Sequence, residues 1–159
     1  GEWAASGSVH PALLQRLMNH AFLEQKPPKS TGREDFNLNW LLAVLDTLQG
    51  RVTDADVQAT LLAFTCETVA SAIDGLGLAG GDLFLCGGGA HNTALWHRLA
   101  SRLPTWHVAS TNALGIAPGW VEACAFAWLA RQRVHHLPGN NPAVTGARGL
   151  RVLGALYAP

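Results

Sequence analysis

Leu83-Phe84-Leu85-Cys86-Gly87-Gly88-Gly89-Ala90-His91-Asn92 sets the architecture of this chain. A short apolar run ends at three consecutive glycines, and a helical pattern follows. This order predicts a buried strand that passes directly into a helix. Glycine lets the backbone of such a turn approach a flat or anionic ligand closely. The N–H groups at the start of the following helix favour phosphate or ribose oxygens.

The glycine turn has two interpretations from sequence. In the first, Gly87, Gly88 and Gly89 form one wall of a nucleotide site, and Asn92 hydrogen-bonds the ligand. In the second, a tight strand–helix turn needs glycine for packing alone, and Asn92 caps the helix. The spacing matches neither of the two common phosphate-loop patterns, GxGxxG and GxxxxGK[ST]. Taken alone, the turn leaves both interpretations open.

The remaining pattern is mostly helical. Helices are expected over residues 11–23, from Phe36 to about Leu48, from Thr53 to Gly75, over 91–103 and from Trp120 to about His135. Thr53 is expected to be the N-cap of its helix. A second strand is expected over Trp106–Val108, a strand end and turn over 1–10, and a strand or packed tail over 150–157. The later alternation of strands and helices predicts an α/β fold in which helices cover an incomplete sheet.

Two strands are few for a whole α/β domain, so part of the sheet is expected to lie outside this chain. The chain also begins at Gly1, and its single methionine is Met18, inside a helical pattern. We therefore expect a piece of a longer protein. Two of the helices carry an expected buried face, one of Leu62, Cys66, Val69 and Ile73 and the other of Val121, Cys124, Ala125, Trp128 and Leu129.

Composition excludes several classes of protein. Of the 159 residues, 48% are hydrophobic and 14% are charged, which argues against disorder. The formal net charge of zero gives no electrostatic case for nucleic acid or an anionic membrane. No apolar stretch approaches the ~20 residues that span a bilayer, and no signal peptide is visible. The six tryptophans indicate large buried or interfacial surfaces.

Candidate chemistry is sparse outside the glycine turn. Cys66, Cys86 and Cys124 are widely spaced in apolar surroundings, so buried free thiols are expected and no metal site. Glu122 is a single acid among apolar residues near a helix start, where it could bind sugar hydroxyls or simply favour the helix dipole. No catalytic dyad or triad, and no general base for phosphoryl transfer, stands out.

A dense polar loop precedes the second long helix. Within six residues it gathers side chains that could hold an anion or join two lobes: Lys29, Ser30, Thr31, Arg33 and Glu34. The alternative is a solvated loop in which Ser30 or Thr31 caps the next helix. Composition alone favours this second interpretation.

Five segments, taken in order, resemble one family closely. They are Pro27-Pro28-Lys29-Ser30-Thr31-Gly32-Arg33-Glu34-Asp35-Phe36, Leu85-Cys86-Gly87-Gly88-Gly89-Ala90-His91-Asn92, Glu122-Ala123 with Ala125-Phe126-Ala127-Trp128-Leu129-Ala130, Leu137-Pro138-Gly139-Asn140 with Pro142-Ala143-Val144-Thr145-Gly146-Ala147, and Leu153-Gly154-Ala155-Leu156-Tyr157. The family is that of the anhydro-N-acetylmuramic acid kinases. The resemblance covers nearly the whole chain and is to the C-terminal part of that enzyme.

The resemblance implies a fold and an activity. The family belongs to the actin, Hsp70 and sugar-kinase superfamily, so residues 1–159 would form a ribonuclease-H-like C-terminal lobe beside a cleft. Its members use ATP and Mg²⁺ to open 1,6-anhydro-N-acetylmuramic acid with water and phosphorylate O6. The product, N-acetylmuramate 6-phosphate, enters murein recycling in the bacterial cytoplasm. The resemblance also implies a tendency to form homodimers.

It further implies roles for particular residues. Gly87, Gly88, Gly89 and Asn92 would lie on the nucleotide side, and Glu122 would face the sugar. The loop from Lys29 to Glu34 would line or support the cleft.

Two family motifs do not occur in residues 1–159: the phosphate loop Gly-Thr-Ser-x-Asp-Gly, and the stretch Asp-Thr-Gly-Pro-Gly-Asn whose aspartate is the catalytic base. Gly119 stands at a position where members of the resembled family commonly have an acidic residue, and Asn141 at one where they commonly have leucine. No catalytic residue is therefore expected here, and this chain alone is expected to be inactive. The alternatives are a non-catalytic nucleotide-binding or dimerisation module and, less well matched, another sugar or acyl kinase of the superfamily.

Overall fold

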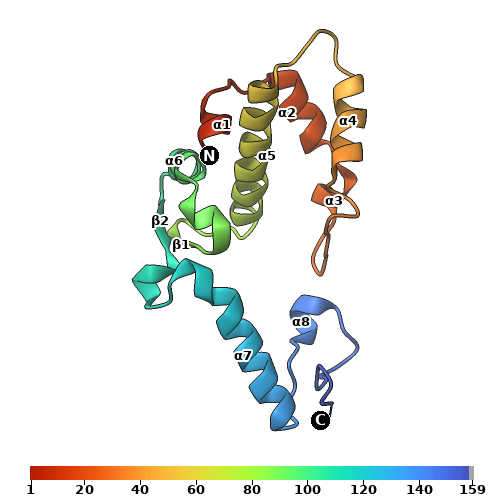
Figure 1. Cartoon of the computed structure of the whole chain (residues 1–159), viewed down its shortest axis with the longest axis vertical. Helices are drawn as coiled ribbons and strands as arrows, with labels where there is room; N and C mark the ends of the chain where they lie inside the picture. Colours follow the sequence, from red (N-terminus) through yellow and green to blue (C-terminus); the bar gives the residue numbers. More distant parts are fainter. Residues whose placement is uncertain (158–159) are drawn as a thin grey trace.

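The computed structural model describes residues 1–157, which form a group of helices on a small sheet (Figure 1). The central element is α5 (Asp54–Asp74), which contacts α1 (Glu2–Ala5), α2 (Pro11–Met18) and α6 (Thr93–Arg102). Two further helices, α3 (Ala21–Glu24) and α4 (Leu38–Asp46), continue from α2. Thr53 caps α5 as expected, since its hydroxyl oxygen accepts the Asp56 N–H at 3.2 Å.

The sheet contains two parallel strands in the described residues, β1 (Gly81–Leu85) and β2 (Trp106–Ser110). Leu83 pairs with Val108, and Leu85 with Ser110. Parallel neighbours need a crossover connection, and α6 provides it. The predicted α/β class is thus confirmed. Three short 3₁₀ helices lie near the strand ends, η1 (Gly87–His91), η2 (Thr111–Leu114) and η3 (Pro118–Trp120).

One face of the sheet is covered. Cys66, Ala70 and Ile73 of α5 form a buried cluster with Leu99 of α6 and with Leu103, the residue that follows α6, and apolar side chains of both strands pack against it. The buried residues of α5 are Ala59, Thr60, Ala63, Cys66, Ala70 and Ile73. The expected face of this helix was therefore partly wrong, because Leu62 and Val69 are only half-buried. Small residues at the centre of the buried face let neighbouring helices approach closely.

Several local predictions were wrong. Residues 2–5 form α1, where a strand end and turn were expected. The single helix expected over 11–23 is interrupted, because His20 begins α3 by accepting the Phe22 N–H at 3.2 Å. Of the three cysteines expected to be buried, Cys86 and Cys124 are exposed. Residues 150–157 form no strand and are all exposed, so neither the strand nor the packed tail expected there is found.

The C-terminal part has a different character. Figure 1 shows α7 (Val121–Val134) leading away from the sheet, with α8 (Pro142–Thr145) and the residues up to 157 returning beside it. No residue of α7 is buried. Of its expected buried face, Cys124, Ala125 and Trp128 are exposed and Val121 and Leu129 are half-buried. The return is tied by backbone and side-chain bonds, including Gly139 N–H to Arg151 O at 2.9 Å and Arg151 N–H to Asn140 Oδ1 at 2.7 Å. Within residues 1–157, no helix is long and apolar enough to cross a bilayer.

Candidate functional site

The glycine turn lies where β1 ends. Gly87 adopts a φ of 63°, a left-handed conformation that favours glycine. Asn92 caps α6, because its Oδ1 accepts the Leu95 N–H at 3.0 Å. The indole N–H of Trp96 donates to the Ala90 carbonyl at 3.0 Å and holds the turn against α6. The capping interpretation of Asn92 is therefore correct for its carbonyl oxygen.

Packing does not account for the whole glycine run. A Cβ added at Gly88 would have no neighbour within 4 Å, and one added at Gly89 would make an ordinary contact with Leu95 at 3.5 Å. Only Gly87 has a conformational need for glycine. The turn is thus exposed and open on the side where side chains would stand. An open backbone surface of this kind is suited to the close approach of a ligand.

Glu122 comes from the neighbouring strand connection. The chain runs from β2 through η2 and η3 into α7, and Glu122 lies in the first turn of α7. The glycine turn contacts η3, and η3 contacts α7. In parallel α/β sheets, ligands bind outside the carboxyl ends of the strands, which is where both connections begin. The fold therefore brings the glycine turn and the start of α7 to one edge of the sheet.

The carboxylate of Glu122 is exposed. In the described part of the chain, the ion pairs involve Arg102 and His107, and none involves Glu122. Its position in the first turn of α7 favours the negative charge through the helix dipole. The side chain is thus available to accept hydrogen bonds from a ligand.

Thr111 is a residue at this edge that the sequence did not suggest. It follows β2 directly, and its hydroxyl is buried without a hydrogen-bond partner among residues 1–157. Buried hydroxyls are normally paired, so this one is an exception at the end of β2. One feature of the sequence could have pointed to Thr111: it comes immediately after the second strand, just as the glycine turn comes after the first.

The loop from Lys29 to Glu34 has structural partners. The Lys29 ammonium donates to the carbonyls of Phe22 and Leu23 at 3.0 and 3.2 Å and lies 4.6 Å from the centre of the Phe22 ring. It therefore satisfies the end of α3. Thr31 donates to the Asp35 carboxylate at 2.7 Å.

The next helix is capped by a residue that the sequence analysis did not name. Asn37 Oδ1 accepts the Trp40 N–H at 3.0 Å, so neither Ser30 nor Thr31 is the cap of α4. The amide of Asn37 donates to the Arg33 and Glu34 carbonyls at 3.2 and 3.0 Å. Lys29 and Ser30 line a hollow of about 480 Å³ with Pro28, Val144 and Thr145, and neither the glycine turn nor Glu122 lines it.

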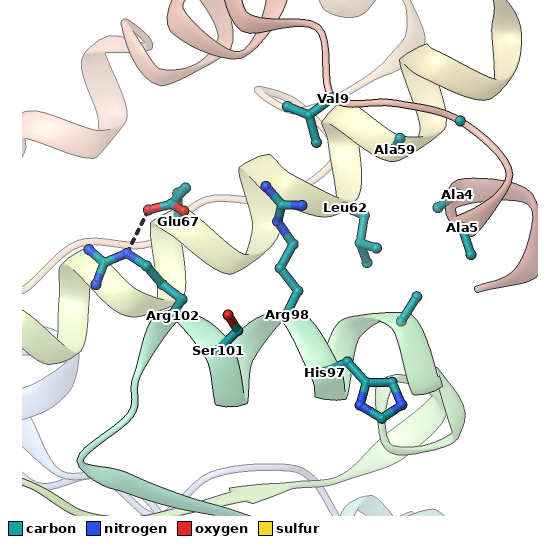
Figure 2. Close-up of a pocket in the computed structure, with 12 residues that line it drawn as sticks. Ala4, Ala5, Val9, Ala59, Leu62, Glu67, His97, Arg98, Ser101 and Arg102 are labelled. Carbon is teal, nitrogen blue, oxygen red and sulfur yellow. Dashed lines mark hydrogen bonds and ion pairs between the residues drawn. The ribbon is translucent and has the colours of Figure 1, made fainter.

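A second hollow, of about 620 Å³, lies between α1, α5 and α6 (Figure 2). Arg102 donates to Glu67 and Asp74, both at 2.9 Å, and these bonds raise the pKa of the guanidinium. Arg98 also lines the hollow, and its buried Nε has no partner in the described part. Gly87, Gly88, Gly89, Asn92 and Glu122 do not line this hollow. We assign it no part in the chemistry at the strand ends.

Residues 1–157 contain no group of three or more histidine, cysteine or acidic side chains that could hold a metal ion. This observation does not bear on a Mg²⁺ ion that accompanies a nucleotide, because such an ion is held by one or two carboxylates together with the phosphates.

Comparison with known proteins gives a consistent result. The family model described as anhydro-N-acetylmuramic acid kinase matches residues 1–159. The anhydro-N-acetylmuramic acid kinase of Thiobacillus denitrificans is 54% identical over 157 residues, which are 99% of this chain and 42% of that protein. Those of Pseudomonas savastanoi and Nitrosomonas europaea are 52% and 51% identical, again over 99% of this chain and 43% and 42% of their own length.

The chain thus spans less than half the length of these relatives. The matches lend no support to the expected assignment to the C-terminal part of the enzyme, and that assignment is set aside. The sequence identity is near 50% over 99% of the chain, and the family model matches the same residues. This chain belongs to the anhydro-N-acetylmuramic acid kinase family.

Proposed function

We propose that this chain forms part of an ATP-dependent kinase that opens 1,6-anhydro-N-acetylmuramic acid with water and phosphorylates O6. In this proposal the chain belongs to a ribonuclease-H-like lobe of an actin-like fold and acts in murein recycling in the bacterial cytoplasm. The observation that carries the proposal is the open space at Gly88. Family membership supplies the reaction, and the glycine turn supplies a surface suited to a nucleotide.

The proposed role of the glycine turn follows from its geometry. With no Cβ at Gly88 or Gly89, a ribose or phosphate group can approach the backbone of η1 closely. Asn92 already uses its carbonyl oxygen as a helix cap, so only its amide group is left for the ligand. ATP supplies the phosphoryl group when it is bound, and the turn orients the nucleotide.

Glu122 is proposed to position the sugar. Its exposed carboxylate can accept hydrogen bonds from sugar hydroxyls at the same sheet edge. The loop from Lys29 to Glu34 is proposed as a support, because its polar groups bond to α3 and to the start of α4. Phosphoryl transfer also needs a base and charge neutralisation around the phosphates. No residue of this chain is assigned those tasks, so the chain alone is expected to be inactive.

Titration calorimetry of ATP with Gly88→Val tests the nucleotide role. Valine fits the fold at this position because its Cβ meets no neighbour, so a loss of binding reports on the ligand. We expect ATP affinity to fall at least tenfold. The control is Gly149→Val, whose Cβ would meet only the tip of the Arg151 side chain, at 3.3 Å. Unchanged ATP affinity in Gly88→Val would remove the turn from the nucleotide site.

Glu122→Gln tests the sugar role in an active enzyme, assembled from this chain and the part of the Thiobacillus relative outside the matched residues. We expect the KM for the anhydro sugar to rise about tenfold while the KM for ATP stays the same, since a charge-assisted hydrogen bond contributes roughly 1.5–3 kcal/mol. Equal effects on both substrates would assign Glu122 a structural role. Nucleotide binding without any turnover in the assembled protein would favour a non-catalytic module.

A further inference from the structure

We infer that α7 is an interior helix of the whole kinase, covered by the part of the same enzyme that lies outside this sequence. The surface in question consists of α7 and the groove between α7 and residues 153–156. The inference rests on the proposed function for the identity of the partner. The exposure of α7 itself is independent of that identity.

Apolar side chains occur all around α7. At 3.6 residues per turn, successive residues are about 100° apart, so Phe126 and Trp128 lie about 200° apart, on nearly opposite faces. Phe126 is 63% exposed and Trp128 is 50% exposed. Val134, on a third face, is 59% exposed. A helix that is apolar on every face is normally buried on every face.

A groove beside α7 gives the surface a specific shape. It has a volume of about 400 Å³ and is lined on one wall by Phe126, Leu129, Ala130, Arg133 and Val134 and on the other by Leu153, Gly154, Ala155 and Leu156. This lining suits one or two aliphatic or aromatic side chains. Arg133 is the charged residue in this lining, and its Nε is buried without a hydrogen-bond partner in residues 1–157.

The distribution of the exposed side chains favours the rest of the kinase over a second copy. A twofold dimer presents one patch to its mate, and one patch cannot cover both Phe126 and Trp128. A longer polypeptide can enclose the helix from several sides. The matched relatives supply such a polypeptide, since the matched region is only 42% of the Thiobacillus protein.

Assembly from two polypeptides tests the inference. This chain, carrying an affinity tag, would be coexpressed with the part of the Thiobacillus relative outside the matched residues, and the purified product weighed by native mass spectrometry. We expect a one-to-one complex. Phe126→Glu and Trp128→Glu should each weaken it at least tenfold, because each places a charge in an apolar contact.

The control is Leu42→Glu, which should leave the complex intact. Leu42 is 48% exposed and belongs to α4, a helix that lies far from α7 in Figure 1. Far-UV circular dichroism confirms that each variant folds. Absence of a complex, or a complex that tolerates both α7 variants, would overturn the inference. So would a homodimer of this chain that Phe126→Glu dissociates, since it would assign the surface to a second copy.

Activity separates this inference from the proposed function. A complex that depends on α7 but does not phosphorylate the anhydro sugar would sustain the interior helix and reject the reaction. An active complex that is indifferent to both α7 variants would do the opposite.

Discussion

The two ends of this chain use similar residues in different ways. Up to Leu103 the three helices α2, α5 and α6 have buried residues, and Leu13, Leu17, Cys66, Leu99 and Leu103 are all at most 2% exposed. From residue 121 to residue 157 no side chain is buried, although this part contains phenylalanine, tryptophan and several leucines. Apolar composition therefore does not by itself make a core. A core also needs elements that supply the opposite wall.

Both ends nevertheless have regular structure. Helix hydrogen bonds are local, so α7 can form from its own backbone without a buried face. Its stability in a protein still depends mainly on packing. We therefore regard the residues up to Leu103 as a packed unit, and residues 121–157 as a part whose apolar side chains lack an opposite wall within this chain.

The largest expected effect comes from truncating matched leucines in the two parts. Leu99→Ala removes a side chain that is 1% exposed in the α5–α6 cluster and should lower the free energy of unfolding by about 2–5 kcal/mol. Leu137→Ala, at a position 44% exposed after α7, should change it by less than about 0.5 kcal/mol. Urea denaturation followed by circular dichroism measures both.

A large loss for Leu137→Ala would break the comparison, because it would reveal a hidden core in the C-terminal part. A small loss of unfolding free energy for Leu99→Ala would also contradict the comparison, because it would mean that the α5–α6 cluster is not a tightly packed core. In the assembled enzyme the two values should move closer together if Leu137 is covered there.

A smaller effect is expected at a buried hydroxyl of the packed part. Thr60 is fully buried, accepts the His10 N–H at 2.9 Å and donates to the Asp56 carbonyl at 2.6 Å, so it joins the start of α2 to α5. Thr60→Val keeps the shape but leaves the His10 N–H without this acceptor. The expected loss of stability is about 1–3 kcal/mol.

Thr65→Val is the matched control on the same helix. Thr65 is exposed, and its hydroxyl donates to the Leu61 carbonyl at 3.0 Å. We expect a change within about 0.5 kcal/mol in the same urea denaturation experiment. Equal losses in the two variants would show that helix propensity, and not the buried bond, sets the effect at Thr60.

The sequence predicted those features that depend on local signals. Thr53 was recognised as a cap, and the glycine run correctly marked the end of β1. The meeting of the glycine turn with the start of α7 was not predicted from the residues, although it agrees with the rule that ligands bind at the carboxyl ends of parallel strands. The partner of Lys29 was not predictable, because it is formed by carbonyls that only the end of α3 exposes.

The errors have a common physical origin. The expected face of α7 failed because a helix with apolar residues on every side has no preferred face in its sequence. Thr111 was missed because an unpaired hydroxyl is recognised only when its surroundings are known. Burial of Cys86 and Cys124 was inferred from apolar neighbours in sequence, but neighbours along a helix or at a turn are not those in space.

The smallest expected effect concerns pH and lies at the anchor of the N-terminal segment. Asp56 accepts the Ser8 N–H and the Thr53 hydroxyl, both at 2.7 Å, and these bonds lower the pKa of its carboxyl below 3.8, chiefly through Ser8. Because the pKa of the carboxyl is lower in the folded state than its ordinary value of 3.8, its charged form stabilises the fold fully above pH 3.8. This stabilisation is lost as pH falls through the folded-state pKa.

Asp56→Asn should therefore be less stable than the wild type near neutral pH, and the gap should narrow below pH 3.8. Urea midpoints measured from roughly pH 3 to pH 7 would follow it. Asp54→Asn, in the same first turn, also removes a carboxylate but keeps both bonds of Asp56, and it is the matched control. If the difference in stability between the wild type and Asp56→Asn is constant with pH, the substitution acts through the geometry of the hydrogen bonds and not through the lost charge. The hydrogen bond that joins Ser8 to α5 would then stabilise the fold through its geometry and not through the charge of Asp56.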